Sequence, residues 1–355
     1  MKFAVATGDF NTAEYEDGTK ILGGSGWIRF GQYVQYSELD PLIGELIWKE
    51  QSGEFGVRDW KGTEHFGIDV LLMQRWMHDT IPARMKTAQG NGQIILNDVD
   101  DWYWGLNPGN QAFHDSHPKV SPRENIIHYR KAVAQSDGVV TSTPYLAERL
   151  SSFVRKDKLV VLPNHIEIDK FRPHVHTEAD KPVIGWLGST AHRSGDLSIL
   201  KGVYSQTKDR YGYHHSAHVG WFPPFYEVVG LGIDDVTILP PAPSEKLGQL
   251  MRFDIGVVPL TSNSFNEAKS WIKGLEYAAA GIPFVASGSS EYKRLKSVYG
   301  VGRIAFKQPE WVKHLEQLRD PAFRQEEADA NLAAIAPLDA PNGAKIWDDI
   351  IRSFA

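Results

Sequence analysis

The chain of 355 residues contains no cysteine. Neither a disulfide nor a thiolate metal site can therefore form, which is compatible with a reducing cytoplasm and predicts a cytoplasmic protein. No apolar run approaches the roughly 18 residues that a membrane-spanning helix needs, and no apolar signal region is found near Met1. Lys and Arg number 38 against 44 Asp and Glu, for a net charge of −6. This balance argues against a protein that wraps long nucleic acid.

The overall composition is that of an ordinary globular protein, with 42% hydrophobic and 23% charged residues. A chain of this length exceeds what one hydrophobic core usually serves, so two domains are expected. Apolar runs at residues 2–7, 44–48, 70–73, 93–97, 138–142 and 158–162 predict the strands of a first sheet. Runs at 182–187, 218–221, 236–239, 255–259 and 282–286 predict a second sheet. The helix-like segments between them indicate parallel α/β sheets.

The segment at residues 253–287 combines a predicted strand, a loop, a helix and a second strand. The helix-length part runs from near Ala268 to Gly281, where Gly281 and Pro283 are placed to end it. At about 100° per residue, Lys269, Lys273 and Glu276 share one face of this helix, opposite an apolar face. Two cations and a carboxylate after a strand end suit a nucleoside diphosphate, with the carboxylate binding ribose hydroxyls.

The same residues also allow a simpler interpretation. Lys273 and Glu276 stand at positions i and i+3, where an ordinary surface pair contributes a few tenths of a kcal/mol. The position after a buried strand favours the binding interpretation.

Two loops rich in small residues follow predicted strands. Gly23-Gly24-Ser25-Gly26 comes after the first strand and implies close approach of the backbone to another element or to a ligand. Its glycines lack the full dinucleotide-binding spacing. Residues 188–196 follow the strand at 182–187 and begin with Gly188, Ser189 and Thr190, with Arg193 nearby. Their backbone N–H groups could bind a phosphate, or the segment could be a tight turn with a helix cap.

Acidic and aromatic side chains gather after the strand predicted at 93–97. Asp98 and Asp100 fall at the carboxyl end of that strand, so we interpret them as site residues. Trp102 and Trp104 follow directly. Such rings are either core packing or apolar platforms for a carbohydrate, and both possibilities stay open.

The run FNEAKSWIKGLEYAAAGIPFVAS at residues 265–287 resembles the nucleotide-sugar site of retaining glycosyltransferases with the GT-B fold. This is the family-4-like group that contains sucrose, glycogen and bacterial mannosyl transferases. The run LPNHIEIDKF at 162–171 resembles the turn that leads into the interdomain linker of these enzymes. The resemblance implies two Rossmann-like domains that face each other across a cleft. Residues 1–168 would bind the acceptor, 169–335 the nucleotide sugar, and 336–355 would form a helix that packs back on the N-terminal domain.

The resemblance also implies roles for single residues. Glu276 matches the ribose-binding glutamate of the family, and Glu267, with Asn266, stands near the donor-sugar glutamate. The two glutamates are nine positions apart here, one more than in the family. Asp98 stands where many relatives have a histidine that faces the reacting sugar. The diphosphate would be bound by Gly24, Gly188, Ser189, Thr190, Arg193, Lys269 and Lys273. The catalytic residues would be Asp98, Asp100 and Lys273. The acceptor would contact Trp102 and Trp104.

The expected reaction is retaining transfer of a sugar from a nucleoside-diphosphate sugar to a hydroxyl of a carbohydrate, a protein or another acceptor. No cofactor and no essential metal is expected. Asp98-Val99-Asp100 also fits the Asp-x-Asp pattern with which the GT-A fold holds a divalent metal, but the phosphate-binding features lie far downstream. Three alternatives stay open: a GT-B sugar-nucleotide epimerase, a glycosyltransferase acting on modified bases in DNA, and a non-catalytic nucleotide-sugar binding protein. Nucleic acid is thus a possible partner, but it is not the favoured one.

Overall fold

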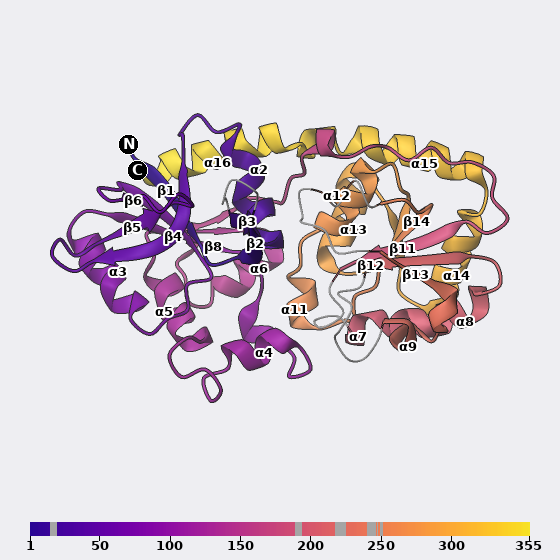
Figure 1. Ribbon diagram of the computed structural model, residues 1–355, viewed down its shortest axis with the longest axis horizontal. Helices are drawn as coiled ribbons and strands as arrows, with labels where there is room; N and C mark the ends of the chain where they lie inside the picture. Colours follow the sequence, from indigo (N-terminus) through magenta and orange to yellow (C-terminus); the bar gives the residue numbers. More distant parts are fainter. Residues whose placement is uncertain (15–19, 189–193, 217–224, 240–245, 247, 249–250) are drawn as a thin grey trace. The chain divides into compact units, whose positions relative to one another are not determined.

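The computed structural model describes residues 1–14, 20–188, 194–216, 225–239, 246, 248 and 251–355 (Figure 1). The chain forms two compact units. Unit 1 comprises Met1–Leu106, Ala112–His165 and Ala340–Ala355, and unit 2 comprises Asn107–Gln111 and Ile166–Asp339. Within the described ranges, no helix is long and apolar enough to cross a membrane.

Unit 1 is built on an eight-stranded sheet with the order β10-β9-β8-β7-β1-β4-β5-β6. The six strands from β10 to β4 are parallel, and β5 and β6 extend the edge with antiparallel pairing. A separate hairpin pairs β2 with β3. The strands are β1 (Phe3–Thr7), β2 (Phe10–Glu14), β3 (Lys20–Leu22), β4 (Leu42–Lys49), β5 (Glu54–Arg58), β6 (Glu64–His65), β7 (Val70–Gln74), β8 (Ile94–Val99), β9 (Gly138–Thr141) and β10 (Leu159–Val161).

Side chains that alternate along β1 and its neighbours pack on both faces of this sheet. Phe3 and Val5 contribute to a core with Phe30, Tyr33 and Trp347. The other face of the sheet packs against α3 and α5. A strand covered on both faces reads as an uninterrupted apolar run, which is why these strands could be predicted. The helices of unit 1 are α1 (Gly24–Gly26), the π-helical turn η1 (Trp27–Gly31), α2 (Gln32–Val34), α3 (Ile81–Gly90), α4 (Gln111–Ser116), α5 (Ile126–Gln135), α6 (Pro144–Leu150) and α16 (Ala340–Phe354). The first three are consecutive and are called the 24–34 helix below.

Unit 2 is built on a six-stranded parallel sheet with the order β13-β12-β11-β14-β15-β16. Its strands are β11 (Val183–Leu187), β12 (Gly212–Ser216), β13 (Val236–Leu239), β14 (Ile255–Val258), β15 (Phe284–Ser287) and β16 (Arg303–Ala305). One face packs against α8 and α14. Its helices include α7 (Ser194–Leu197), α8 (Ile199–Thr207), α9 (Phe225–Val229), α11 (Ser264–Glu267), α12 (Ile272–Ala279), α13 (Ser290–Tyr299), α14 (Gln308–Gln317) and α15 (Pro321–Ala334).

The strands predicted within the described residues are present in both sheets. The strand predicted at 218–221 lies outside the described residues, and the second sheet contains β12 at Gly212–Ser216, which was not predicted. The two parallel sheets confirm the predicted α/β class.

The helix predicted from near Ala268 begins only at Ile272, as α12, and residues 268–271 separate it from the short helix α11. Trp271 in this break is fully buried, and the Arg294 guanidinium lies 3.9 Å from the centre of its ring. Tertiary packing of such a large side chain can override the helical composition of a segment. The prediction that Lys269 shares a helix face with Lys273 is wrong, because Lys269 lies outside both helices.

α16 is the most amphipathic element of unit 1, and Trp347 is its central side chain. Trp347 is fully buried and meets Phe3 edge-on, with ring centroids 5.2 Å apart. We predict that Trp347→Ala lowers the free energy of unfolding of unit 1 by about 3–5 kcal/mol, because it removes a large apolar side chain and leaves a cavity. Urea denaturation followed by circular dichroism measures the change.

The adjacent Ile346 provides the matched control, since it is 45% exposed. Ile346→Ala should change stability by no more than about 0.5 kcal/mol. Equal losses in the two variants would contradict the packing of α16 on the sheet of unit 1.

Candidate functional site

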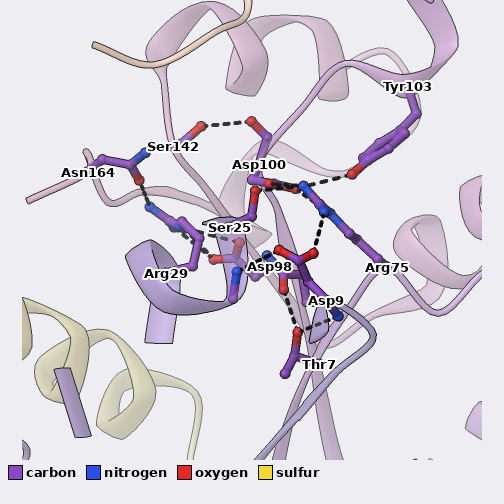
Figure 2. Close-up of polar contacts among 12 residues, drawn as sticks. Thr7, Asp9, Ser25, Arg29, Arg75, Asp98, Asp100, Tyr103, Ser142 and Asn164 are labelled. Atoms are coloured by element: carbon purple, nitrogen blue, oxygen red, sulfur yellow. Dashed lines mark hydrogen bonds and ion pairs between the residues drawn. The ribbon is translucent and has the colours of Figure 1, made fainter. Parts of the chain in front are cut away.

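In unit 1, a network of charged side chains lies at the carboxyl ends of β1, β7 and β8 (Figure 2). Asp9 follows β1, Arg75 follows β7, and Asp98 and Asp100 lie at the end of β8. Parallel strands bring their carboxyl ends to one edge of the sheet, and open α/β sheets bind ligands there. Two of the four, Asp98 and Asp100, are predicted from the sequence.

Asp98 forms a buried, bidentate ion pair with Arg29 of the 24–34 helix. Arg29 Nε donates to both carboxylate oxygens at 3.1 Å, and Nη2 donates to Oδ2 at 2.7 Å. Arg29 Nη1 also donates to the carbonyl of Leu162 at 2.7 Å and to Asn164 Oδ1 at 2.8 Å. Both charged side chains are 1% exposed. Asp98 is therefore enclosed by protein atoms, and its predicted contact with the acceptor stays a prediction.

The environment acts on the pKa values of this pair in opposing ways. Burial raises the pKa of the Asp98 carboxyl above its ordinary value, against the attraction of Arg29. Burial also lowers the pKa of Arg29, but Asp98 outweighs this effect, so that the pKa of Arg29 lies above its ordinary value. Arg29 is therefore a permanent cation at the centre of the unit.

Arg75 links the other carboxylates of the network. Its Nη2 donates to Asp100 Oδ2 at 2.7 Å and to Ser25 Oγ at 2.6 Å, and Nη1 lies 3.3 Å from Asp9 Oδ1. Burial raises the pKa of Asp100, but Arg75 and Ser25 outweigh this effect and hold the pKa below its ordinary value. Arg75 has a φ of 62°, a conformation that costs on the order of 1–3 kcal/mol outside glycine and is concentrated at functional sites.

The glycine cluster brings the 24–34 helix close to Asp9. Gly26 N–H donates to Asp9 Oδ2 at 2.8 Å, and a Cβ at Gly23 would lie 2.2 Å from Asp9 Oδ1. The glycines thus accommodate a neighbouring element, one of the two possibilities that the sequence leaves open. Gly24, the predicted diphosphate contact, is the first residue of this helix.

Trp102 and Trp104 lie in an aromatic cluster of unit 1. Trp102 is 7% exposed, and its ring centroid is 5.1 Å from that of Trp104. Trp104 stacks on Tyr129 with centroids 5.6 Å apart and meets Phe153 edge-on. This arrangement is typical of core packing, and a contact with an acceptor stays a prediction for both.

In unit 2, a hydrogen-bonded cluster joins the segments that follow β11 and β14. Asp196 of α7 accepts from Thr261 N at 2.8 Å, from Thr261 Oγ1 at 2.7 Å and from Asn266 Nδ2 at 2.7 Å. Asn266, a predicted donor-sugar residue, is thus held by Asp196. Gly188 directly follows β11 as predicted, whereas Ser189, Thr190 and Arg193 lie outside the described residues.

Glu267, the other predicted donor-sugar residue, is the last residue of α11, and its side chain contacts the N-terminus of α13. Its Oε2 accepts from Ser290 N at 2.9 Å and from Ser290 Oγ at 2.5 Å. The carboxylate thus satisfies a free N–H of the first turn and interacts favourably with the helix dipole. Several polar groups therefore lie where β15 ends: those of Glu267, Ser287 and Ser289.

Lys273 and Glu276 are brought together by the first turns of α12. Lys273 Nζ lies 2.7 Å from Glu276 Oε2. The side chain of Glu276 is 6% exposed and that of Lys273 is 25% exposed, so this is not the ordinary surface pair that the spacing alone allows. The Nζ atom of Lys269 lies 4.2 Å from the centre of the Phe265 ring.

Asp9, Arg29, Arg75 and Asp196 were not identified as site residues from the sequence, although Asp196 ends the segment 188–196. Asp9 and Arg75 follow buried strands within two residues, and this signal could have identified them. The sequence gives a weaker indication for Arg29, which stands four residues after Ser25 and therefore on the same face of a helix that starts with glycines. Asp196 carries none beyond its place in a helix after a strand.

Comparisons with known proteins bear on the fold. No protein-family model matches the chain, and no curated protein matches its sequence. Among solved structures, a glycosyltransferase from Rickettsia africae matches with a TM-score of 0.63 and 11% identity over 99% of this chain and 98% of that one. Sucrose-phosphate synthase from Thermosynechococcus elongatus matches with a TM-score of 0.61 and 14% identity, over 81% and 74% of the two chains.

A UDP-forming α,α-trehalose-phosphate synthase from Burkholderia xenovorans matches with a TM-score of 0.54 and 11% identity, over 80% of this chain and 73% of that one. At these identities the similarity concerns the arrangement of helices and strands. Two Rossmann-like units, one on a mixed eight-stranded sheet and one on a parallel six-stranded sheet, give this chain the GT-B fold of glycosyltransferases.

Proposed function

We propose that the chain is a retaining glycosyltransferase that takes a sugar from a nucleoside-diphosphate sugar bound to unit 2 and transfers it to a hydroxyl of an acceptor bound to unit 1. The acceptor is a carbohydrate, a protein or another molecule with a hydroxyl group. The observation that carries the proposal is the Lys273–Glu276 pair, a partly exposed cation over a buried carboxylate in the first turns of α12. Retention is proposed from the resemblance of residues 265–287 to retaining enzymes.

The proposed role of Lys273 is electrostatic. As the bond to the sugar breaks, negative charge develops on the departing diphosphate, and a cation already in place stabilises it without reorganisation. The N-terminus of α12 adds a partial positive charge. Lys269, Gly188, Ser189, Thr190, Arg193 and Gly24 are proposed as further diphosphate contacts. Because this charge comes from the chain itself, we propose that the reaction needs no metal.

Glu276 is proposed to bind the ribose. A carboxylate only accepts hydrogen bonds, and ribose hydroxyls donate them. Its burial next to Lys273 fixes its position, so the cation and the acceptor of hydrogen bonds lie one helical turn apart. Asn266 and Glu267 are proposed to contact the donor sugar.

The acidic network of unit 1 is proposed to act on the acceptor. Asp100 would orient the attacking hydroxyl or take its proton, and its lowered pKa keeps it ionised for this task. Asp98, enclosed with Arg29, would support this edge of the sheet, so its predicted catalytic role would be indirect. Trp102 and Trp104 are retained as proposed acceptor contacts.

A donor series tests the proposal. Melting curves recorded with UDP, GDP and ADP sugars should show stabilisation by one class of donor, about 2.7 kcal/mol at a hundred times its Kd. Incubation with that donor and a panel of acceptors, including hydroxymethylated DNA, should then give a glycosylated product with retained configuration. Isomerised donor without acceptor would indicate an epimerase, and binding without turnover a binding protein.

We predict that Lys273→Ala and Lys269→Ala each weaken donor binding by about ten- to a hundredfold, because a charge-assisted contact to phosphate is worth roughly 1.5–3 kcal/mol. Isothermal titration calorimetry measures the change. Lys293→Ala, on the exposed side of α13, is the control and should bind normally. Wild-type affinity in both of the first two variants would refute the phosphate assignment.

Glu276→Ala should weaken binding of the whole sugar nucleotide while changing little for a sugar phosphate that lacks the nucleoside. The reason is that only the former presents ribose hydroxyls to the carboxylate. Titration of both ligands measures the difference, and Glu276→Gln, which keeps one carbonyl acceptor, should lie between wild type and Ala. Equal losses for the two ligands would mean that Glu276 acts only through Lys273.

Transfer should survive excess EDTA, and Asp100→Asn should lower turnover with nearly unchanged donor affinity. Asp98→Asn should in addition lower the free energy of unfolding by about 3–5 kcal/mol, because Arg29 would stay buried without its anion. Steady-state kinetics and urea denaturation separate these effects. Loss of transfer on chelation, its recovery with manganese and loss of donor binding in both variants would favour a metal held by the two aspartates.

A further inference from the structure

Asn266 of α11 is a buried polar residue whose amide nitrogen and amide oxygen are used unequally. The residue is 3% exposed. Its Nδ2 donates to Asp196 Oδ1 at 2.7 Å and to the carbonyl oxygen of Thr261 at 2.9 Å, and it lies 3.2 Å from Thr261 Oγ1. No group in the described part of the chain donates to Asn266 Oδ1. This oxygen is therefore the atom that the side chain can offer to a ligand.

The contacts of Asn266 permit only one orientation of its amide group. An amide nitrogen donates hydrogen bonds, whereas a carboxylate oxygen and a peptide carbonyl oxygen only accept them. With the amide reversed, its oxygen would lie 2.7 Å from Asp196 Oδ1 and 2.9 Å from the carbonyl oxygen of Thr261, with no hydrogen in either contact. Polar atoms that are buried without partners are costly. Asp196 and Thr261 therefore turn the amide nitrogen toward themselves and the amide oxygen away.

Asp196 is itself fixed by the segment that follows β14. Its Oδ1 also accepts from Thr261 N at 2.8 Å and from Thr261 Oγ1 at 2.7 Å. The backbone of Asn266 is held separately, because its N–H donates to Oδ1 of Asn263, the N-cap residue of α11, at 2.9 Å. Backbone and side chain of Asn266 are thus both fixed before a ligand arrives. A group held in this way loses little further freedom on binding.

The oxygen that Asn266 offers defines the group that it can bind. An amide oxygen only accepts hydrogen bonds, and a sugar hydroxyl donates one. We propose that Asp196 is a positioning residue for the donor sugar, which fixes the Asn266 amide so that Asn266 Oδ1 accepts a hydrogen bond from one sugar hydroxyl. This inference rests on the proposed function, in which Asn266 contacts the donor sugar. A donor that lacks this hydroxyl would be rejected, because the amide oxygen would lose its contact with water without replacement.

The contact is tested with donors in which single hydroxyl groups are replaced by fluorine, which carries no proton to donate. The parent probes are UDP-glucose, GDP-mannose and ADP-glucose, titrated into the full chain by isothermal titration calorimetry. For the donor that binds, replacement of one particular sugar hydroxyl should weaken binding about tenfold, as expected when one hydrogen bond is lost and its acceptor stays unpaired. Asn266→Ala should bind the parent donor and that fluoro derivative with equal affinity.

Three variants of Asp196 separate positioning from a purely structural contribution. Asp196→Ala should abolish discrimination at the same hydroxyl, because the amide of Asn266 is no longer fixed. Asp196→Asn should retain it, since an amide oxygen can accept the same three hydrogen bonds. Asp196→Glu keeps the charge but displaces the acceptor by one methylene group, so it should also lose the discrimination. Asp209→Ala, at an exposed position of the same unit, is the control and should discriminate as the wild type does.

Melting curves identify any variant that does not fold, and Asn266→Ala tests the contact without a change at Asp196. Wild-type discrimination in Asn266→Ala would overturn the hydrogen bond to the hydroxyl. Discrimination retained in folded Asp196→Ala or Asp196→Glu would mean that Asp196 has a structural role only. A wild-type chain that binds a donor but discriminates against no fluoro derivative would overturn this inference and leave the proposed donor binding intact. If none of the three parent donors binds, the proposed function fails and this inference with it.

Discussion

The ion pair of Arg29 with Asp98 is the interaction on which the polar edge of unit 1 depends. A guanidinium and a carboxylate that are both enclosed have lost their water, and only their mutual charge and a full set of hydrogen bonds compensate for that loss. Arg29 achieves this by also donating to the segment after β10, at Leu162 and Asn164. One side chain thereby joins the 24–34 helix, β8 and the chain that follows β10. Since the helix is fixed at Arg29, Ser25 is fixed one turn earlier, and with it Arg75 and Asp100.

In unit 2, two carboxylates fix the segments at strand ends by accepting hydrogen bonds. Asp196 fixes the loop after β14, and Glu267 fixes the start of α13. Lys273 and Glu276 differ from these, because one member of the pair keeps contact with solvent. A cation on a flexible stem, held by a rigid and buried carboxylate, can move to an arriving anion without disturbing the core. The Lys273–Glu276 pair is thus partly exposed, whereas the Arg29–Asp98 pair is enclosed.

The sheets could be predicted from the sequence because strands buried on both faces produce continuous apolar runs, as in β7 and β14. The helix that the resemblance implies within residues 336–355 is present as α16. The break before α12 was not predicted from the sequence, and the contact of Trp271 in this break with Arg294, 23 residues away, is not visible in a local pattern. The partner of Asp98 was missed for the same reason: Arg29 lies 69 residues away, and a pattern of neighbours contains no information about such a contact. The GT-B fold was predicted from the resemblance to glycosyltransferases, because the local sequence patterns indicate only the α/β class.

The place of α16 in the chain has a consequence for the order in which the protein folds during synthesis. Its side chains complete the core of unit 1, yet Ile166–Asp339 of unit 2 lie between it and the rest of that unit. At a ribosomal rate of about 5–20 residues per second, translation of that interval takes roughly 10–35 s. During this time the first sheet has one apolar face without its final covering helix. The second unit can therefore finish folding before the core of the first is complete, the reverse of the usual order from the N-terminus.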